Sequence, residues 1–588
     1  MLKGGIIRLL ENKNILEIVL LAVVFATLLY EGSGFIGREI SHSYPYGYLA
    51  SDAFWHENVA NYIKKEGSYK YHPPYMSAGY KDVVGFNPPL LYQLVASFSI
   101  LTGLEAYDAF YILIILLICF SAMAVYFIIK QFNSHVAMLS LPLFVFLFTK
   151  RFVIDVTWGQ WIFISGGFFI IVFFWGMTKL ELRHSYALLV IFIAALASAH
   201  QSEMVFAIGF IIIFIAIKSL SKKFDMSEIA PSHDPSFSSE KEGRFLSMLK
   251  NTLRPLGRGV FDIKQSKGIA LAVIIALVLS SYPLLIFSAG WGKFSGIRPF
   301  SVELPSEWNS GRSVVPLTDF SKIVLIVIVI GMVFALLIKE RVNVAVPAGF
   351  YMLLIGYGNY FGLSNRAFQT RFFWPVYLAV FFGLALYQLV KFVPKGYRQL
   401  SSLAITLILL FAFLNLFYEK QASPGLMDPY HWESLSWVRE NTDKNAKVFY
   451  FYYDNYYQSA LLWTSERLAF LIDRNDYIDG LQKGIIKRDY ISTLTSSSDT
   501  RFIYKKGLFS FGYHQDEDKL ETRKQRDICS FDYYIFDMLP QFSSIPELTK
   551  YNALIRDKFI EKDMEELFNN QVVSILKNNN PGADCIGG

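Results

Sequence analysis

Long, nearly charge-free apolar stretches recur along most of the chain and are separated by short polar segments. Each stretch is close to the ~20 residues that an α-helix needs to cross a bilayer, so the pattern predicts a polytopic α-helical membrane protein. About eleven spans are expected, at residues 15–30, 107–130, 135–149, 161–177, 185–199, 204–218, 268–289, 321–338, 343–360, 372–391 and 400–418.

From about residue 421 the sequence becomes charged and turn-rich, which predicts a membrane module at 1–420 and a soluble domain at 421–588. Asp428 followed by Pro429 is typical of a helix start, and this helix is expected to continue through Glu440. The pattern also predicts strands at 447–453, 531–538 and 571–577 and a helix at 546–555. Together these elements indicate a small α/β domain.

The composition agrees with a membrane protein, because 53% of the 588 residues are hydrophobic and 17% are aromatic. A net charge of +6 could suggest nucleic-acid binding, but the basic residues cluster in short segments between apolar stretches. They are better explained as signals of membrane topology. The sequence has no P-loop and no glycine-rich dinucleotide fingerprint, which argues against ATP-driven transport.

Basic residues also predict the orientation of the chain in a cell membrane. Those before the first stretch place the N-terminus in the cytoplasm, and this stretch, without a cleavage site, is interpreted as a retained signal anchor. If residues 88–102 lie at the interface or re-enter, every strongly basic connector is cytoplasmic, including the 219–267 loop. The loop at 31–106 and the C-terminal domain are then extracytoplasmic. Cys529 and Cys585 could pair only in that location.

The first external loop carries the most informative sequence, Ser51 to Ile63. Asp52 and His56 are four positions apart and therefore share one face of a helix, so a carboxylate and an imidazole point the same way at the membrane surface. The alternative is that Ser51 or Asp52 only caps this helix and that His56 is an interfacial histidine.

Further ionisable residues lie in the other external segments. His200 and Glu203 interrupt two apolar stretches at the outer face, where such groups are costly; a solvated hairpin is the alternative. Arg366 and Arg371 flank a short outer loop, and arginine presents a planar fork suited to a phosphate. An arginine that only extends toward the lipid headgroups is the alternative there.

These motifs resemble those of the polytopic glycosyltransferases of the GT-C superfold, which include oligosaccharyltransferases, protein O-mannosyltransferases and aminoarabinose transferases. The matching features, in order, are Asp52 and His56 in the first external loop, Pro88-Pro89-Leu90, and a glycine after a short apolar stretch. Asp155 stands where such enzymes carry a second acidic residue in the next external loop. The resemblance is nearest to archaeal and bacterial members and covers most of the chain in architecture.

The resemblance implies transfer of a sugar, with inversion, from a polyprenyl-phosphate-linked donor to an external glycan, lipid or protein acceptor. In this interpretation Asp52 accepts the proton of the acceptor hydroxyl, His56 orients or assists, and Arg371 stabilises the phosphate leaving group. Asp155, also catalytic, and Glu203 shape the site or hold a divalent cation. That cation would be Mg²⁺ or Mn²⁺, with Asp52 and Asp155 as its ligands. Additional substrate-binding residues are predicted at Glu57, His200, Glu203 and Arg366.

Three other functions remain open at this point: an oligosaccharyltransferase-like enzyme, a transporter or lipid flippase, and a non-enzymatic scaffold. The aromatic run from Tyr450 to Tyr457 is similar to a sequon-reading motif of oligosaccharyltransferases, but it lacks the tryptophans and the glycine of that motif. Residues 448–453 are therefore interpreted as a core strand. A transporter would place ionisable residues at mid-membrane, whereas here they gather at the outer rim.

Overall fold

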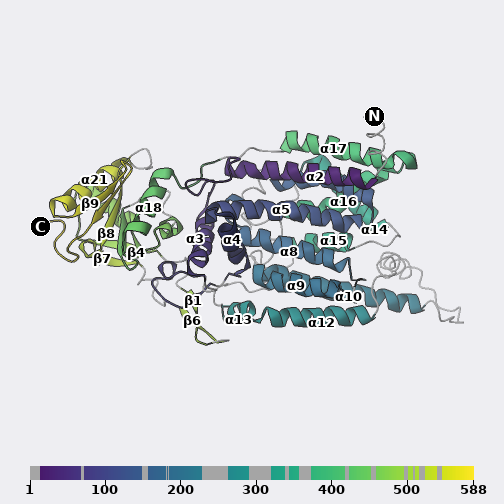
Figure 1. The fold of residues 1–588 in the computed structure, drawn as a ribbon, viewed down its shortest axis with the longest axis horizontal. Coiled ribbons are helices and arrows are strands. Elements are labelled where there is room, and N and C mark those ends of the chain that lie inside the picture. Colours follow the sequence, from purple (N-terminus) through teal and green to yellow (C-terminus); the bar gives the residue numbers. More distant parts are fainter. Residues whose placement is uncertain are drawn as a thin grey trace.

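A computed structural model of the chain describes residues 13–67, 72–85, 87–148, 156–180, 182, 184–227, 263–290, 320–337, 344–356, 373–417, 423–451, 459–495, 501–507, 510–515, 523–539 and 546–587. Apolar helices lie side by side in a bundle, and the C-terminal domain lies at one end of it (Figure 1). The N-terminus is at the opposite end. Helices α3 (Ser51–Glu66) and α4 (Leu90–Thr102) lie between the bundle and the C-terminal domain.

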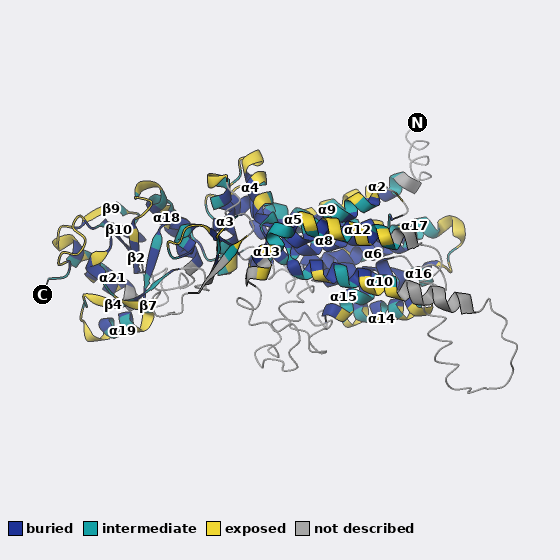
Figure 2. Ribbon diagram, turned by 90° about the horizontal axis from the view of Figure 1, so that it is seen from below, coloured by how far each residue is buried: buried dark blue, intermediate teal, exposed yellow. Residues whose placement is uncertain are grey.

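The helical bundle is built from the apolar stretches of the sequence. Its helices are α2 (Lys13–Gly32), α5 (Ala106–Lys130), α6 (Ser134–Ser140), α8 (Trp161–Met177), α9 (Ser185–Ala199), α10 (Gln201–Ser227), α12 (Ile263–Leu279), α13 (Ser281–Gly290), α14 (Lys322–Leu337), α15 (Ala345–Gly356), α16 (Trp374–Val390) and α17 (Arg398–Phe417). Buried residues fill the centre of the bundle and exposed apolar residues lie on its outer faces (Figure 2). This distribution fits a bundle surrounded by lipid rather than water.

An apolar helix occupies each predicted span, in agreement with a multi-pass membrane protein. Three segments of the described chain are long and apolar enough to cross a bilayer by themselves, namely Ile15–Ile36, Ala106–Lys130 and Lys395–Leu416. The others are shorter apolar helices. The predicted span 135–149 is divided into α6 and a 3₁₀ segment, η3 (Leu141–Phe148), and the predicted span 268–289 is divided into α12 and α13. Helix α4 has 13 residues and lies beside α3 between the bundle and the C-terminal domain.

Glycines set the closest helix contacts within the bundle. A Cβ atom on Gly331 of α14 would lie 1.8 Å from the carbonyl oxygen of Phe381 in α16. A Cβ atom on Gly383, half a turn further along α16, would lie 2.4 Å from the carbonyl oxygen of Val136 in α6. Only a residue without a side chain permits such backbone contact, so these positions fix where α14, α16 and α6 cross.

The C-terminal domain contains a seven-stranded mixed sheet in the order β7-β4-β3-β2-β8-β10-β9. The strands are β2 (Lys447–Phe451), β3 (Leu468–Ile472), β4 (Asp489–Leu494), β7 (Arg523–Asp527), β8 (Tyr533–Asp537), β9 (Glu565–Asn569) and β10 (Val573–Lys577). Strand β2 is parallel to both β3 and β8, and the remaining pairs are antiparallel. Helices α18 (Pro429–Asn441), α19 (Arg474–Lys483) and α21 (Pro546–Glu561) complete the domain.

The expected elements of this domain are present. Asp428 is the N-cap of α18 and accepts hydrogen bonds from the backbone N–H groups of Tyr430 and His431. In β2 the residues from Val448 to Phe451 are all buried, which confirms the core-strand interpretation for that part of the aromatic run. The rest of the run lies outside the described residues.

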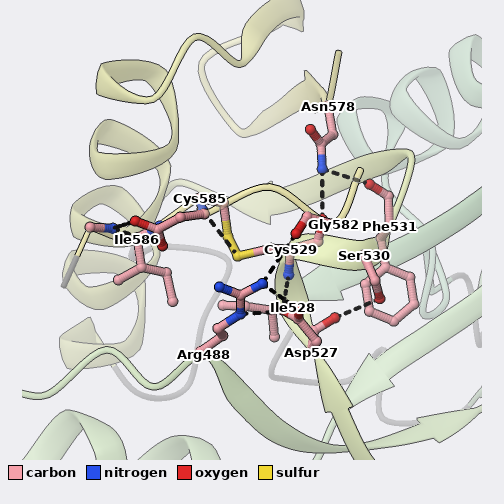
Figure 3. Close-up of polar contacts among 12 residues, drawn as sticks. Arg488, Asp527, Ile528, Cys529, Ser530, Phe531, Asn578, Gly582, Cys585 and Ile586 are labelled. Atoms are coloured by element: carbon pink, nitrogen blue, oxygen red, sulfur yellow. Dashed lines mark hydrogen bonds and ion pairs between the residues drawn. A yellow bond between two sulfur atoms is a disulfide. The ribbon is translucent and has the colours of Figure 1, made fainter. Parts of the chain in front are cut away.

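A disulfide joins Cys529 to Cys585 and ties the C-terminal end to the turn before β8 (Figure 3). The side chain of Asn578 donates hydrogen bonds to the carbonyl oxygens of Cys529 and Phe531, and Arg488 forms an ion pair with Asp527 at 2.9 Å. The third cysteine, Cys119, is buried in α5 and unpaired. The sequence left this pairing open, and the structure contains it.

The loop at 31–106 and the C-terminal part of the chain are directly paired. Strand β1 (Val83–Val84) is antiparallel to β5 (Arg501–Lys505), and β5 forms a hairpin with β6 (Phe511–Gln515). Near the domain boundary, Gly47 N–H donates to the carbonyl oxygen of Pro424 at 3.0 Å. These contacts place α3 between the bundle and the domain.

Candidate active site

Asp52 lies in the first turn of α3, and its side chain is exposed. The N-cap of this helix is Ala50, so Ser51 and Asp52 lie within its first turn and neither occupies the N-cap position. A carboxylate at this position is instead stabilised by the positive end of the helix dipole. Gln160 donates a hydrogen bond to Asp52 Oδ2 at 3.3 Å.

The segment that carries Gln160 is held against α3 by its backbone. Leu49 N–H donates a hydrogen bond to the carbonyl oxygen of Thr157 at 3.0 Å. The indole N–H of Trp161 donates a hydrogen bond to the carbonyl oxygen of Val156 at 2.6 Å. Gly159 has a φ of +83°, and a Cβ atom there would lie 2.5 Å from the backbone nitrogen of Ala53. Any other residue would push this segment away from α3. The position of Gln160 relative to Asp52 is thus fixed by the fold.

His56 is buried on the inner side of α3 rather than exposed beside Asp52. Its Nδ1 lies 2.9 Å from the hydroxyl of Tyr92 in α4, and its ring contacts the ring of Trp161 at 5.8 Å between centroids. Burial lowers the pKa of His56 to about 3, against a smaller opposing effect of a hydrogen bond with the Gly159 backbone. The imidazole is therefore neutral at physiological pH and connects α3, α4 and the segment that carries Gln160.

Glu57 lies on a different side of α3, toward the C-terminal domain. Its carboxyl group is buried, and Oε2 has no hydrogen-bond partner within the described residues. Burial raises the pKa of Glu57 to about 8, and the charge of Arg439 in α18 opposes the shift. Next to it, Lys65 and Glu466 form an ion pair between α3 and the domain. The structure thus places Glu57 at the contact between α3 and the domain.

His200 and Glu203 form a hydrogen-bonded pair at the start of α10. Glu203 is buried, and the ring of His200 lies 4.5 Å from that of Phe163 in α8. A Cβ atom on Gly166 would lie 2.6 Å from His200 Cβ, so the pair packs directly on α8. A solvated hairpin would not bury this carboxylate. The first turns of α8 therefore contact both His56, through Trp161, and the pair of His200 and Glu203.

Three predicted site residues, Asp155, Arg366 and Arg371, lie outside the described residues. Within the described part of the chain, no group of three His, Cys, Asp or Glu side chains converges in a way that could hold a metal ion. Asp52 is thus the one assigned metal ligand that the structure describes, and its neighbour Gln160 supplies an amide rather than a carboxylate.

Three further residues of this region were not identified from the sequence. Gln160 and Tyr92 are neutral side chains whose roles depend on contacts with residues far away in sequence. Trp158 is two positions before Gln160, and 45% of its side chain is exposed. An exposed aromatic ring in the segment that carries Gln160 is suited to stacking on a sugar. The only local signal for this segment was the Trp-Gly pair within an external loop.

Comparison with known proteins supports the fold. No model of a protein family matches the sequence, and no curated protein matches it. The structure is similar to ArnT from Cupriavidus metallidurans in the apo state, with a TM-score of 0.50, 9% identity, and coverage of 95% of this chain and 97% of that chain. ArnT has the GT-C fold, and the chain described here shares that fold.

Two other solved structures align over similar lengths. The oligosaccharyltransferase of Archaeoglobus fulgidus in the apo form has a TM-score of 0.47 at 10% identity, with coverage of 95% of this chain and 88% of that chain. ArnT from Cupriavidus metallidurans bound to undecaprenyl phosphate has a TM-score of 0.44 at 10% identity, with coverage of 97% and 99%. The GT-C resemblance expected from the sequence is confirmed at the level of the fold.

Proposed function

We propose that the protein transfers a sugar from a polyprenyl-phosphate-linked donor to an acceptor outside the cytoplasm, with inversion at the anomeric carbon. The observation that carries the proposal is the exposed carboxylate of Asp52, held by Gln160 at the end of a bundle with the GT-C fold. The donor class is inferred from ArnT of Cupriavidus metallidurans, whose fold is similar and which binds undecaprenyl phosphate.

In this proposal Asp52 is the general base. Its carboxylate accepts the proton of the acceptor hydroxyl while the hydroxyl oxygen forms a bond to the anomeric carbon of the donor sugar. The bond between that carbon and the phosphate oxygen breaks, and the polyprenyl phosphate leaves with the electron pair. Arg371 is proposed to stabilise the leaving phosphate, and Arg366, Asp155 and Glu203 to complete the site. Mg²⁺ or Mn²⁺, if required, would supply further charge stabilisation at Asp52 and Asp155.

His56 acts in this proposal as a positioning residue. Because its pKa is about 3, it neither accepts nor supplies a proton near neutral pH. It instead holds Tyr92 and the backbone of Gly159, which precedes Gln160, in contact with α3. Trp158 is proposed to stack on a sugar ring of the substrate.

The proposal requires the site and the C-terminal domain to face the outside of the cell membrane. The disulfide between Cys529 and Cys585 supports this orientation, because disulfides persist in oxidising compartments. Engineered cysteines in the 290–320 loop and after residue 425 should react with an impermeant reagent added to intact cells, whereas cysteines in the 219–267 loop should not. Labelling of the 219–267 loop from outside would exclude this orientation.

The decisive experiment replaces the base. A panel of labelled polyprenyl-phosphate sugars is first incubated with membranes that contain the wild-type protein, to identify a donor. Asp52→Asn should then reduce transfer by about 10²–10⁴-fold, the usual contribution of general base catalysis. Because Asp52 is exposed and asparagine keeps its size, expression and thermal stability should stay close to wild type.

Glu39→Gln is the matched control, because Glu39 is an exposed acidic residue of the same external loop. It should transfer at the wild-type rate. Full transfer by Asp52→Asn on the identified donor would exclude Asp52 as the base. Transfer to an Asn-x-Ser/Thr peptide in the same assay would identify an oligosaccharyltransferase-like enzyme instead.

A further inference from the structure

A groove runs along the outside of the helical bundle between α14 and α16, with a volume of about 580 Å³. Its walls are apolar for most of their length and end at one cationic side chain. The residues that line it include Val327, Ile330 and Phe334 on α14, and Leu386, Leu389 and Lys391 on and just after α16.

The groove exists because α14 and α16 touch at one point beside it. Gly331 brings the backbone of α14 against Phe381, and larger side chains keep the helices apart next to this crossing. From Ala385 to Phe392 the groove follows about two turns of helix, or roughly 10 Å. One leaflet of a bilayer core is about 15 Å deep, so the groove could hold much of one acyl chain.

The groove lies at the far end of the bundle from the candidate active site. His56 of α3 contacts Phe110, near the beginning of α5. By contrast, Gly383 of α16 packs on Val136, which follows the end of α5. Helix α5 has 25 residues and is therefore about 37 Å long. In the proposed orientation the groove opens into the cytoplasmic leaflet.

The ammonium group of Lys391 is positioned at the end of the groove. It donates to Gln388 Oε1 at 3.0 Å and lies 5.3 Å from the centre of the Tyr387 ring. An ammonium group has three N–H donors, so two remain for a ligand. Within the described part of the chain, no acidic side chain forms an ion pair with Lys391.

The backbone around Lys391 is also fixed. Arg398, at the start of α17, donates to the carbonyl oxygen of Lys391 at 2.8 Å and to that of Val393 at 3.0 Å. The guanidinium thereby holds the turn between α16 and α17 in one conformation. A cation is thus pre-positioned at the rim of an apolar groove that faces lipid.

We propose that this groove binds an anionic phospholipid, with one acyl chain along α14 and α16 and the phosphate on Lys391. The charge of Lys391 selects an anionic headgroup, and the cytoplasmic leaflet is where anionic lipids are enriched. The apolar walls select a lipid over a soluble anion, since the groove offers the chain a larger contact area than a convex helix face. This site is separate from the proposed donor site at Asp52.

The experiment measures lipids retained by the full-length protein in native mass spectrometry, after exchange into mixed micelles of detergent with phosphatidylglycerol or phosphatidylcholine of identical acyl chains. The wild-type protein should retain phosphatidylglycerol about 5-fold better, the preference expected from one lysine at a membrane surface. Lys391→Gln should reduce this ratio to about 1. The matched control, Lys395→Gln, removes an exposed cation of the same turn that does not line the groove, and should keep the preference.

A second pair of variants tests the groove itself. Leu389→Trp fills the groove at a residue whose side chain is 63% exposed, and it should lower retention of both lipids. The control Leu354→Trp changes a residue of α15 that is 57% exposed and lies outside the groove. This variant should retain both lipids as the wild-type protein does. Equal losses from Lys391→Gln and Lys395→Gln, or wild-type retention by Leu389→Trp, would overturn the proposal. Neither result depends on the transferase activity.

Discussion

Two buried histidines, one beside the candidate active site and one in the C-terminal domain, carry opposite charge states. His56 in α3 is surrounded by the rings of Trp55, Tyr92, Phe110 and Trp161, and its pKa falls to about 3. His431 in α18 is buried as well, but it lies 2.5 Å from Asp428 and 3.7 Å from Asp537.

The difference arises from the neighbours and not from burial. Burial alone lowers the pKa of His431, but the hydrogen bond with Asp428 and the negative charges of Asp428 and Asp537 outweigh it and raise the pKa to about 9. Aromatic rings offer His56 no such compensation. The membrane-proximal region thus uses a neutral imidazole to position backbone and hydroxyl groups, whereas the soluble domain uses an imidazolium to neutralise two carboxylates in its interior.

The first test of the difference between the two histidines concerns His431, which should cause the largest change: a loss of stability at alkaline pH. The pKa of His431 is raised above its unfolded value of 6.5, so its contribution is fully present below pH 6.5 and is lost as pH rises through 9. The free energy of unfolding should fall by about 3 kcal/mol over this range. Chemical denaturation of the full chain in detergent at several pH values measures it.

The titration of Glu57 also contributes to the pH dependence of stability, so this contribution must be separated from that of His431. The folded pKa of Glu57, about 8, lies above the unfolded value, so Glu57 also reduces stability as pH rises, between pH 4.5 and 8. Glu57→Gln is therefore the background for the comparison. In that background, His431→Leu should remove the slope between pH 6.5 and 9. An unchanged slope in the double variant would show that His431 is not charged in the folded protein.

A smaller effect of opposite sign is expected from His56 at acid pH. Its folded pKa is depressed, so the unfolded chain binds a proton below pH 6.5 that the folded chain does not bind until about pH 3. Between pH 7 and 5 the wild-type protein should lose about 2 kcal/mol more stability than His56→Phe, which keeps the aromatic packing. Parallel pH profiles for the two proteins would argue that His56 is solvated.

The smallest effect concerns the contact between Gln160 and Asp52. Removing one neutral donor from a hydrogen bond of 3.3 Å should slow transfer by about 2- to 10-fold, equivalent to roughly 0.5–1.5 kcal/mol. Gln160→Ala should leave unfolding unchanged at both ends of the pH range, because Gln160 does not titrate. Wild-type turnover in this variant would indicate that the carboxylate is held by other groups.

The sequence predicts best the elements of the fold that are long or clearly bounded. The apolar stretches anticipated the bundle, and the Asp-Pro pair at 428 and 429 anticipated α18 and its cap. Strand β3 was not predicted, because five consecutive apolar residues cannot be distinguished from part of a buried helix by periodicity. Strand β9 is a charged edge strand of sequence EELFN, which lacks the alternation that identifies strands.

The candidate site was predicted only as far as helical spacing allows. Asp52 and His56 were correctly placed on one helix, but spacing does not reveal that one is exposed and the other buried. Gln160 reaches Asp52 because Gly159 adopts a positive φ, which depends on the tertiary contact with Ala53. Glu57 was assigned to substrate binding, yet its carboxyl group is buried toward the C-terminal domain, and adjacent helical residues such as His56 and Glu57 point about 100° apart.

The pairing of β1 with β5 has a consequence for the order of synthesis. Val83 and Val84 leave the ribosome roughly 400 residues before their partners Tyr504 and Ile503, which at about 5–20 residues per second is a delay of about 20–80 s. Throughout that interval the backbone groups of Val83 and Val84 that will pair with β5 have no partner strand and remain open to water or to chaperones. Translation of β5 is therefore the step that completes this pairing.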